Sequence, residues 1–352
     1  MERVLADLVN RLDQRRFESH VMALQYVGRF GRDLESAATV HLGPRQERAS
    51  LLWPRRLAEA IRRLAPDVVH THSGVWYKAA KAARAAGVAR LVHTEHGRHV
   101  PDPWISRRLD RVASRRTDVV VAVSEKTATL LVRAVGVDRD RVRVVRNGIE
   151  AKRVASAGTR ALRRSFSIAS DARIVASVGR LEPVKGYDLL IDAFARLALV
   201  DSGESPPVLI VAGDGSQRSA LEARAFDSGI ADQIRFVGWL DDVASLLEEA
   251  SVFALGSHSE GTSISLLEAM AAGCCPVVTD VGGNADVLGA GLAHRLVPPS
   301  DADALSTALS RALEGAEERR ADGETARERV RREFDLGTMV EQYSAIYEDR
   351  EA

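Results

Sequence analysis

The 352-residue chain is longer than one ordinary hydrophobic core supports, so its length predicts two domains of roughly 150 to 200 residues. Hydrophobic residues at 45% and charged residues at 28% exclude an intrinsically disordered chain. The 49 Lys and Arg residues balance 49 Asp and Glu residues, so no overall field would draw the protein to nucleic acid, and we expect no nucleic-acid partner.

Strand and helix patterns alternate through the first half of the chain. Apolar, β-branched runs predict strands at residues 18–24, 67–72, 90–93, 118–124 and 142–145. Amphipathic patterns predict helices at residues 2–12, 51–64, 75–86, 104–116 and 125–135. This alternation predicts an α/β domain with a parallel sheet and helices on both of its faces.

One element of this pattern is missing at the start of the chain. A doubly wound domain should open with a strand, whereas residues 2–12 have the pattern of an amphipathic helix. We therefore expect either a start that lies upstream or a sheet that has lost an element from its middle.

The second half repeats the alternation and predicts a second doubly wound domain. Strands are expected at residues 173–178, 208–212, 234–237, 252–255, 276–279 and 293–297. Helices are expected at residues 188–197, 217–226, 242–250, 263–272 and from 302 onward. Regular strand patterning stops between Asn147 and Ala169, which predicts domains at 1–150 and 151–335 and leaves a last helix within 336–352.

The cysteines and the hydropathy pattern point to a cellular compartment. The only two cysteines, Cys274 and Cys275, are adjacent, and we expect two small buried side chains in a reducing compartment. No run of about 18 apolar residues and no signal-peptide pattern is present. We expect a cytoplasmic protein, with contact at a membrane surface as a further possibility.

The segment after the predicted strand 252–255 carries the first chemical signal. A Gly-containing loop leads into the predicted helix 263–272, with Thr262 or Ser263 as its N-cap. The helix N-terminus offers backbone donors and a positive dipole end, which suit a diphosphate. Glu260 and Glu268 are displaced by roughly one sugar ring and are candidates to accept hydrogen bonds from sugar hydroxyls; the alternative is two surface carboxylates.

A second signal follows the predicted strand 173–178. Arg180 and Lys185 lie in one strand-to-helix loop, where together they would neutralise a departing pyrophosphate. An ordinary pair of solvated surface charges is the alternative interpretation.

Together these segments resemble the retaining glycosyltransferases of family 4, and the resemblance covers nearly the whole chain. It rests on Val178-Gly-Arg-Leu with Lys185-Gly186, on Val211-Ala-Gly-Asp-Gly215, on Phe236-Val-Gly238, on Glu260 and Glu268 separated by seven residues, and on Asn147-Gly148-Ile149. The resemblance implies a GT-B fold of two Rossmann-like doubly wound domains with a cleft between them. It implies an acceptor-binding first domain, a donor-binding second domain, and a final helix at 336–347 that crosses back to the first.

The resemblance also assigns roles to residues in the second domain. It implies that Arg180 and Lys185 bind the donor diphosphate, that Glu260 binds the sugar hydroxyls and that Glu268 binds the nucleotide ribose. Further donor-binding residues are expected around the nucleotide and at the helix start: Gly213, Gly238, Gly261, Thr262 and Ser263.

In the first half, His93-Thr-Glu-His96-Gly97 is similar to the family's His-Gly segment. We expect His96 to hydrogen-bond the donor sugar and to stabilise an oxocarbenium-like transition state, not to act as a nucleophile. His93, His96 and His99 suggest zinc as an alternative, but this spacing on a strand and turn does not bring three ligands together.

Two further features bear on cofactors and partners. Asp241-Asp242 is expected to cap the helix that follows, and no metal or other cofactor is expected to be required. Residues 104–116 read as a basic amphipathic helix that would rest on anionic lipid; the alternative is a surface helix that packs Leu109 and Val112 on the sheet.

The resulting prediction is a retaining glycosyltransferase that uses a nucleotide-diphosphate sugar and a saccharide or lipid-linked acceptor in polysaccharide or glycolipid synthesis. The family's Gly-Gly loop, which follows its first strand, has no counterpart at Met1-Glu2-Arg3. An inactive sugar-nucleotide-binding protein therefore stays open as an alternative, as does a sugar-nucleotide epimerase of the same fold. No Gly-x-Gly-x-x-Gly follows a predicted strand, which argues against a dinucleotide dehydrogenase.

Overall fold

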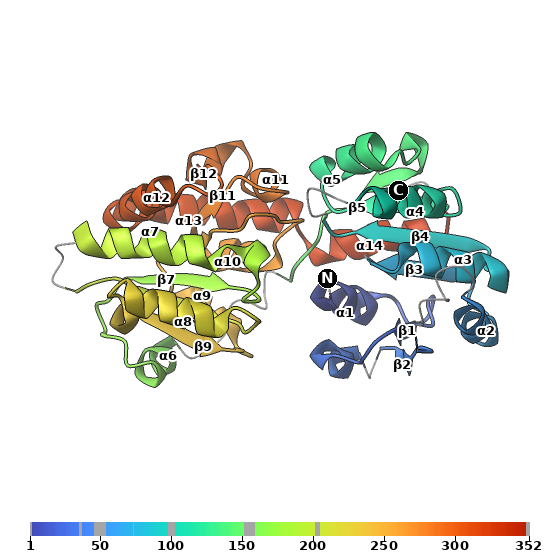
Figure 1. Ribbon diagram of the computed structural model, residues 1–352, viewed down its shortest axis with the longest axis horizontal. Helices are drawn as coiled ribbons and strands as arrows, with labels where there is room; N and C mark the ends of the chain where they lie inside the picture. The colour runs from blue at the N-terminus through green and yellow to red at the C-terminus, as the bar shows by residue number, and fades with distance from the viewer. Residues whose placement is uncertain are drawn as a thin grey trace. The chain divides into compact units, whose positions relative to one another are not determined.

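The computed structural model of the protein forms two compact units (Figure 1). The structure describes residues 2–34, 37–45, 54–72, 74–97, 103–150, 159–200 and 205–349. Unit 1 consists of residues 1–148 together with 336–352, and unit 2 consists of residues 149–335. The segment that begins at Leu336 thus belongs to the same unit as the start of the chain.

Unit 2 contains a six-stranded parallel sheet in the order β12-β11-β10-β7-β8-β9. Its strands are β7 (Ile174–Val178), β8 (Val208–Ala212), β9 (Ile234–Gly238), β10 (Val252–Leu255), β11 (Cys275–Thr279) and β12 (Leu296–Val297). Its helices are α6 (Thr159–Ser165), α7 (Tyr187–Val200), α8 (Arg218–Asp227), α9 (Val243–Glu249), α10 (Ile264–Ala272), α11 (Asn284–Leu288), α12 (Ala302–Glu314) and α13 (Ala316–Glu333). The strand order reverses at β7, which is the first strand of the unit and lies in the middle of its sheet.

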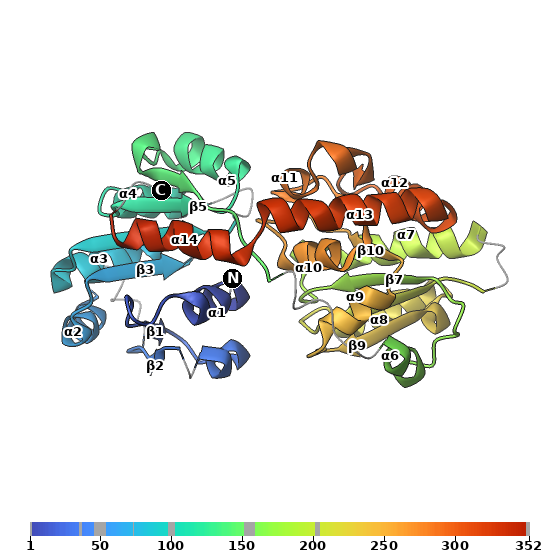
Figure 2. The same ribbon diagram turned by 180° about the vertical axis from the view of Figure 1, so that it is seen from behind.

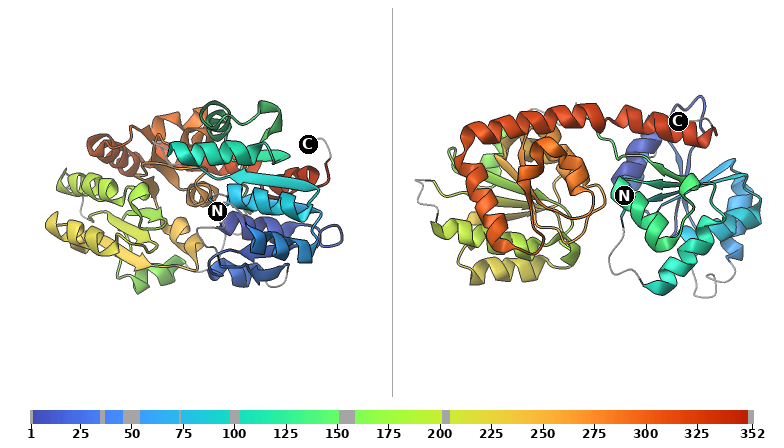
Figure 3. Two further views of the ribbon diagram at one scale, coloured as in Figure 1. Left: turned by 45° about the vertical axis from the view of Figure 1, so that its right-hand side comes forward. Right: turned by 90° about the horizontal axis from the view of Figure 1, so that it is seen from above.

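Each face of this sheet has its own hydrophobic core, because successive strand residues point to opposite sides. Val252 and Ala254 pack toward α7, α8 and α12, while Phe253 and Leu255 pack toward α9, α10 and α13. Helices therefore cover both faces, as Figure 3 shows. Nearly every residue of β7, β8, β10 and β11 is buried, as expected for a parallel sheet inside two helical layers.

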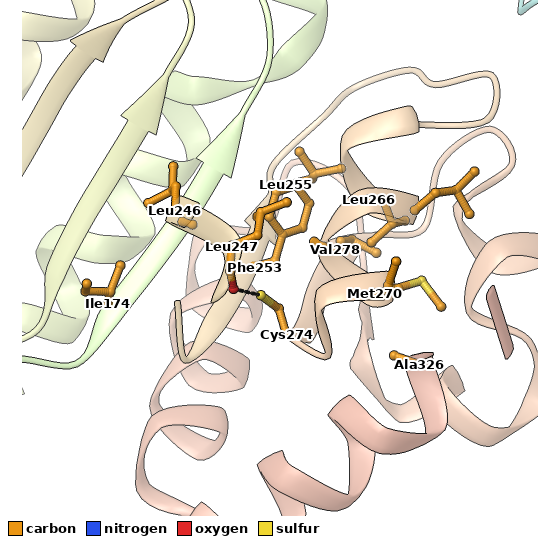
Figure 4. Close-up of a cluster of buried hydrophobic side chains, with 14 of the residues drawn as sticks. Ile174, Leu246, Leu247, Phe253, Leu255, Leu266, Met270, Cys274, Val278 and Ala326 are labelled. Carbon is orange, nitrogen blue, oxygen red and sulfur yellow. Dashed lines mark hydrogen bonds between the residues drawn. The ribbon is translucent and has the colours of Figure 1, made fainter. Parts of the chain in front are cut away.

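The second of these cores contains one of the two cysteines (Figure 4). The Cys274 thiol donates to the Leu247 carbonyl oxygen at 2.8 Å and lies among Leu246, Met270 and Ala326. Both cysteines are buried free thiols, which confirms the sequence prediction. Burial raises the pKa of each thiol to about 12, so neither is a reactive thiolate at neutral pH.

Unit 1 has its parallel strands in two separate sheets, β1-β2 and β3-β4-β5-β6. The strands are β1 (His20–Ala23), β2 (Thr39–Leu42), β3 (Val68–His72), β4 (Arg90–Glu95), β5 (Val119–Ala122) and β6 (Val142–Val144). The helices are α1 (Glu2–Arg11), α2 (Arg55–Leu64), α3 (Trp76–Ala86), α4 (Trp104–Ser114), α5 (Glu125–Leu130), which continues as a π-helix to Val135, and α14 (Leu336–Tyr347).

The two sheets of unit 1 share their helical layers. Met22 and Leu24 from the β1 region pack with Val69 of β3 into the core beneath α2 and α3. Val21 of β1 packs on the other side, against the α1 core residues Ala6 and Val9. The sheets are thus two parts of one layer. Among the described residues, β1 pairs only with β2 and β3 pairs only with β4, so one edge of each strand has no strand partner.

Helix α14 lies along β3 and β4 (Figure 2), and polar contacts fix it there. The Tyr347 hydroxyl contacts His70 Nδ1 at 2.7 Å, and the Tyr343 hydroxyl contacts Thr94 Oγ1 at 3.0 Å. Arg90 Nε donates to the Ile346 carbonyl oxygen at 2.6 Å. The last helix of the chain therefore covers one face of the unit 1 sheet.

Sequence patterns found most of these elements but missed the short ones. They gave no signal for β2, α6 or α11, and the structure has only two strand residues in 293–297 because a 3₁₀-helix occupies Ala290–Arg295. These elements have four to seven residues, which carry too few periods to mark an element. No helix among the described residues is long and apolar enough to cross a membrane.

Candidate active site

The candidate site lies at the carboxyl edge of the unit 2 sheet, where the strand order reverses. β7 and β10 are neighbours in the sheet, with Val175 opposite Val252. The chain leaves β7 toward α7 on one face and leaves β10 toward α10 on the other. Open parallel sheets bind ligands at such a switch point, because the two diverging loops leave room between them.

The loop after β7 is held against the loop after β10 by their backbones. Lys185 ends a short 3₁₀-helix, and Gly186 follows in the left-handed region at φ 58°. A Cβ atom on Gly186 would lie 2.0 Å from the Gly256 carbonyl oxygen, so only glycine fits. The His258 amide donates to the Val184 carbonyl oxygen at 2.9 Å and fastens the two loops together.

Two of the predicted site residues meet directly. Lys185 Nζ lies 2.7 Å from Glu260 Oε1, and their side chains are 19% and 7% exposed. Ser257 Oγ donates to the same carboxylate oxygen at 2.7 Å. Such low exposure makes this ion pair more than a surface contact, since both charges have lost most of their water.

The start of α10 adjoins this pair. Ser263 is the N-cap, and its hydroxyl accepts from the Leu266 amide at 3.4 Å; of the two proposed caps, the structure selects Ser263. Thr262 and Ser263 are buried, and Glu268 lies half-buried one turn into the helix. The Gly283 amide donates to the Gly261 carbonyl oxygen at 2.9 Å, which attaches the loop after β11 to this one.

Arg180 lies in the same loop as Lys185 but is exposed. Its guanidinium makes no hydrogen bond or ion pair within the described part of the chain. Its neighbours are fixed: the Leu181 amide donates to the Asp214 carbonyl oxygen at 3.0 Å, and Ser216 Oγ donates to Glu182 at 2.8 Å. The hydrogen bonds from Ser216 lower the pKa of the Glu182 carboxyl below its usual value. The structure thus presents Arg180 on an ordered loop.

The predicted glycines of β8 and β9 adjoin the loop after β7. The Gly213 amide donates to the Gly238 carbonyl oxygen at 2.7 Å, and Gly213 adopts φ 139°. A Cβ atom on Gly213 would lie 1.9 Å from the Gly179 carbonyl oxygen. The positions of Gly179, Gly213 and Gly238 bring the loops after β7, β8 and β9 into backbone contact.

Sequence reasoning missed a buried hydroxyl pair below these loops. Tyr187 opens α7 and is 3% exposed, and Ser177 of β7 is 1% exposed. A Cβ atom on Gly179 would lie 3.1 Å from the Tyr187 hydroxyl. Burial raises the pKa of Tyr187 and the charge of Glu260 raises it further, against the opposing effect of Ser177. The only sequence signal was a tyrosine directly after Lys185-Gly186.

In unit 1, the predicted residue His96 follows β4 and belongs to a group of histidines. His96 Nε2 lies 2.9 Å from His72 Nδ1. Burial lowers the pKa of His96 to about 2, and the charge of His72 adds to this effect. His93 instead stacks on Trp76 and contacts Thr71 Oγ1 at 2.8 Å, which gives it a structural role in the core. His99, named in the zinc alternative, lies outside the described residues.

One group of residues in the described chain has the ligand types of a metal site, and it does not include the histidines of the zinc alternative. His294, Glu318 and Asp322 come within reach of one another near the amino end of β12. Arg295 already pairs with Asp322 at 2.6 Å and with Glu318 at 3.5 Å, which makes this cluster an ion-pair network. Asp242, the other metal candidate, caps α9 by accepting from the Ser245 amide, as expected.

Comparisons with known proteins cover both units. A family model described as "Glycosyl transferases group 1" matches residues 159–329, and one described as "Glycosyltransferase Family 4" matches residues 1–153. The chain is 30% identical to glycogen synthase of Mycobacterium tuberculosis over 90% of this chain and 76% of that protein. It is 28% identical to N-acetyl-alpha-D-glucosaminyl L-malate synthase of Bacillus anthracis over 84% of this chain and 77% of that protein.

Solved structures agree on the fold. The crystal structure of Anabaena HepE in complex with UDP-glucose superimposes with a TM-score of 0.85 at 21% identity, covering 99% of this chain and 95% of HepE. A glycosyltransferase from Rickettsia africae gives a TM-score of 0.82 at 18% identity, covering 99% and 94%. With two parallel α/β units, matching models over both halves and a relative at 30% identity, the chain belongs to the family 4, group 1 glycosyltransferases of the GT-B fold.

Proposed function

We propose that this glycosyltransferase takes a sugar from a nucleotide-diphosphate donor that binds at the switch point of unit 2. The observation that carries the proposal is the contact between Lys185 and Glu260, 2.7 Å apart and largely shielded from water. It joins one loop that carries cations to another that precedes a helix N-terminus. This combination suits a diphosphate next to a hydroxyl-bearing group.

In the proposed mechanism, the charges of the site act on the leaving group. Lys185 and Arg180 stabilise the negative charge that develops on the diphosphate as its bond to the sugar C1 breaks. The N-terminus of α10 adds its dipole, so no metal is needed for this step. Glu260 accepts hydrogen bonds from hydroxyls of the transferred sugar, and Glu268 accepts them from the ribose. His96 is the proposed hydrogen-bond partner of the sugar in unit 1.

We propose transfer with retention of configuration to a saccharide or lipid-linked acceptor. The acceptor hydroxyl oxygen forms the new bond to C1 on the face from which the diphosphate departs. Its proton passes to an oxygen of the departing phosphate, so the step balances without a protein nucleophile. The two carboxylates of the proposed site have other tasks, since Glu260 is paired with Lys185 and Ser257 and Glu268 is assigned to the ribose.

Calorimetric titration of UDP, GDP and ADP tests the donor proposal. We expect one of them to bind best, and Glu268→Ala to weaken that binding about 10- to 100-fold, since a buried hydroxyl loses its acceptor at a cost of about 1–3 kcal/mol. Glu222→Ala, on the exposed side of α8, is the matched control and should leave affinity unchanged. Unchanged affinity in Glu268→Ala would remove its ribose role.

Turnover distinguishes the proposed activity from its alternatives. With the preferred nucleotide sugar and a chelator present, we expect transfer to an acceptor, and a loss of about 100-fold or more in kcat for Lys185→Ala. Binding without transfer or hydrolysis would favour an inert binding protein. Release of an epimer without an acceptor would favour an epimerase.

We also propose that α4 attaches the protein to anionic membrane. Trp104 and Ile105 are 59% and 54% exposed at its start, and Arg107, Arg108 and Arg111 are exposed beside them. The Arg108 guanidinium lies 5.1 Å from the Trp104 ring centre. Exposed apolar side chains within a basic surface suit the headgroup region of anionic lipid.

Sedimentation with vesicles tests this attachment. We expect binding to phosphatidylserine-containing vesicles but not to phosphatidylcholine vesicles, and loss of binding at high salt. Trp104→Ser with Ile105→Ser should weaken binding several-fold, whereas Phe226→Ser, 75% exposed on α8, should not. Equal loss in both variants, or equal binding to both vesicles, would contradict the proposal.

A further inference from the structure

Two neighbouring histidines in unit 1 share a single hydrogen bond. His72 ends β3 and His96 follows β4, and His72 Nδ1 lies 2.9 Å from His96 Nε2. Their rings stack at 24° with centres 5.2 Å apart. Of the two facing nitrogens, one must carry a hydrogen atom and the other must present a lone pair.

Both rings are neutral at physiological pH, so each carries only one hydrogen. Burial lowers the pKa of His72 to about 4 and that of His96 to about 2. A neutral imidazole that donates from one nitrogen therefore has a bare lone pair on the other. The direction of the shared bond consequently fixes the position of the proton in both rings.

The second nitrogen of His72 indicates the direction. His72 Nε2 is shut off from solvent and has no hydrogen-bond partner within the described chain. If His96 donated, His72 would carry its hydrogen on Nε2 and bury an N–H group without an acceptor. Buried orphan N–H groups are rarer in proteins than under-satisfied acceptors. The favoured arrangement has His72 Nδ1–H donating to His96 Nε2.

We propose that His72 is a positioning residue that fixes His96 in the tautomer with its proton on Nδ1, so that His96 presents an N–H donor. The use of this donor on the transferred sugar rests on the proposed function. A neutral donor suits that task, because it can bind a hydroxyl oxygen and adds no positive charge beside an oxocarbenium-like transition state.

The same arrangement explains why a histidine accompanies His96. A carbonyl oxygen can only accept a hydrogen bond and would hold the proton of His96 on Nε2, whereas His72 can donate. His72 orients the ring by its hydrogen bond, and its proximity also opposes protonation of His96. The His70 ring lies against the His72 ring at a tilt of 38°, with ring centres 4.1 Å apart, and is itself held by Tyr347 and Thr94. The orientation of His72 is thus supported from β3, β4 and α14.

NMR of ¹⁵N-histidine-labelled full-length protein tests the tautomer directly. We expect the His96 signal to show a protonated Nδ1 and a bare Nε2, and His72→Phe to change this pattern. The His20–His41 pair provides a control, because it has the same Nδ1 to Nε2 contact at 3.0 Å in an exposed place. His20→Phe should leave the His96 signal unchanged.

Kinetics test the positioning role. We expect His72→Phe to lower kcat about ten-fold with KM for the donor nearly unchanged, and His72→Asn, whose amide can replace Nδ1–H, to restore most of it. A wild-type His96 protonated on Nε2, or a tautomer that His72→Phe does not alter, overturns the inference. If the wild-type protein shows the His96 Nδ1–H signal but His96→Ala transfers sugar normally, the tautomer assignment stands and the role of His96 in the proposed function fails.

Discussion

The two units are built on the same plan but differ in how completely their sheets are buried. In unit 2, β7 and β10 lie in the middle of one continuous sheet, and their residues are almost all buried. In unit 1, β1 and β3 are edges of separate sheets, and most of their residues are only half-buried. β4, which has neighbours on both sides, is buried nearly throughout. Burial therefore follows a strand's neighbours and not only its sequence.

The units also differ in the chemistry that they bury. The site of unit 2 contains the largely buried pair of Lys185 and Glu260, and the hydroxyls of Tyr187 and Ser177 are buried in the same unit. Unit 1 buries neutral histidines, of which His70 hydrogen-bonds to Thr94 and to Tyr347 of α14. The strands of unit 2 contain no histidine, whereas the buried neutral histidines of unit 1 oppose acid. The two units should therefore respond differently to pH.

Acidification should give the largest difference between the units. Burial lowers the pKa of His70 well below 6.5, that of His72 to about 4 and that of His96 to about 2. The unfolded chain binds these protons below about pH 6.5 and the folded unit does not, so stability is full above that pH and falls as the pH drops toward 4. Together, the three lowered pKa values correspond to a loss of folding stability in acid on the order of several kcal/mol.

Hydrogen exchange at pH 7, 5.5 and 4.5, corrected for intrinsic rates, measures this effect. Amides of β3 and β4 should lose protection at lower pH, while amides of β10 and β11 should keep it. His70→Gln should reduce the difference. Earlier loss of protection in β10 would show that unit 2 is the acid-sensitive one.

A backbone contact at the site of unit 2 should give the next largest difference. Gly213→Ala combines φ 139° with a Cβ atom 1.9 Å from the Gly179 carbonyl oxygen, and we expect a loss of about 3 kcal/mol or more. Gly87→Ala in unit 1 is the matched control, since it has φ 84° but open space around the new atom; its cost should be about 1 kcal/mol. Hydrogen exchange of the amides near each glycine measures the loss of stability, and calorimetric titration measures the nucleotide affinity.

The outcome separates close packing from backbone strain. Equal losses in Gly213→Ala and Gly87→Ala would mean that positive φ alone accounts for both. A loss of nucleotide affinity in Gly213→Ala without a loss of protection in β8 would show that the loop shifts while the sheet stays intact.

Much of the fold could be predicted from the sequence because long periodic segments carry it. The runs that became β8 and β10 are continuous and apolar, and the helices α7 and α14 are regular over several turns. β2 escaped prediction because its four residues, two exposed and two half-buried, show no clear alternation. The helical pattern of residues 2–12 indicated that the unit 1 sheet could lack an element. The sequence did not indicate which strands would have an unpaired edge, because this depends on how the strands pair in the folded chain.

The candidate site was predictable where chemistry and spacing coincide. Lys185 and Glu260 come from loops 75 residues apart, and they meet because β7 and β10 are neighbours in the sheet. No spacing rule indicates the pairing of His72 with His96, because it depends on the register that places His72 opposite Thr94. Tyr187 was overlooked since a single aromatic residue at a helix start is more often a core residue.

A pair of matched core substitutions gives the smallest expected difference. It tests whether the position of a strand within its sheet determines how much a buried valine contributes to stability. Val252→Ala in β10 removes two methyl groups from a side chain that is fully buried, and should cost about 2–3 kcal/mol. Val69→Ala in β3 removes the same groups from a half-buried side chain, and should cost about 1 kcal/mol. Protection of amides in each strand measures the two costs separately. Equal costs would mean that β3 is packed as firmly as a central strand despite its open edge, and that the contrast between the units lies in pairing alone.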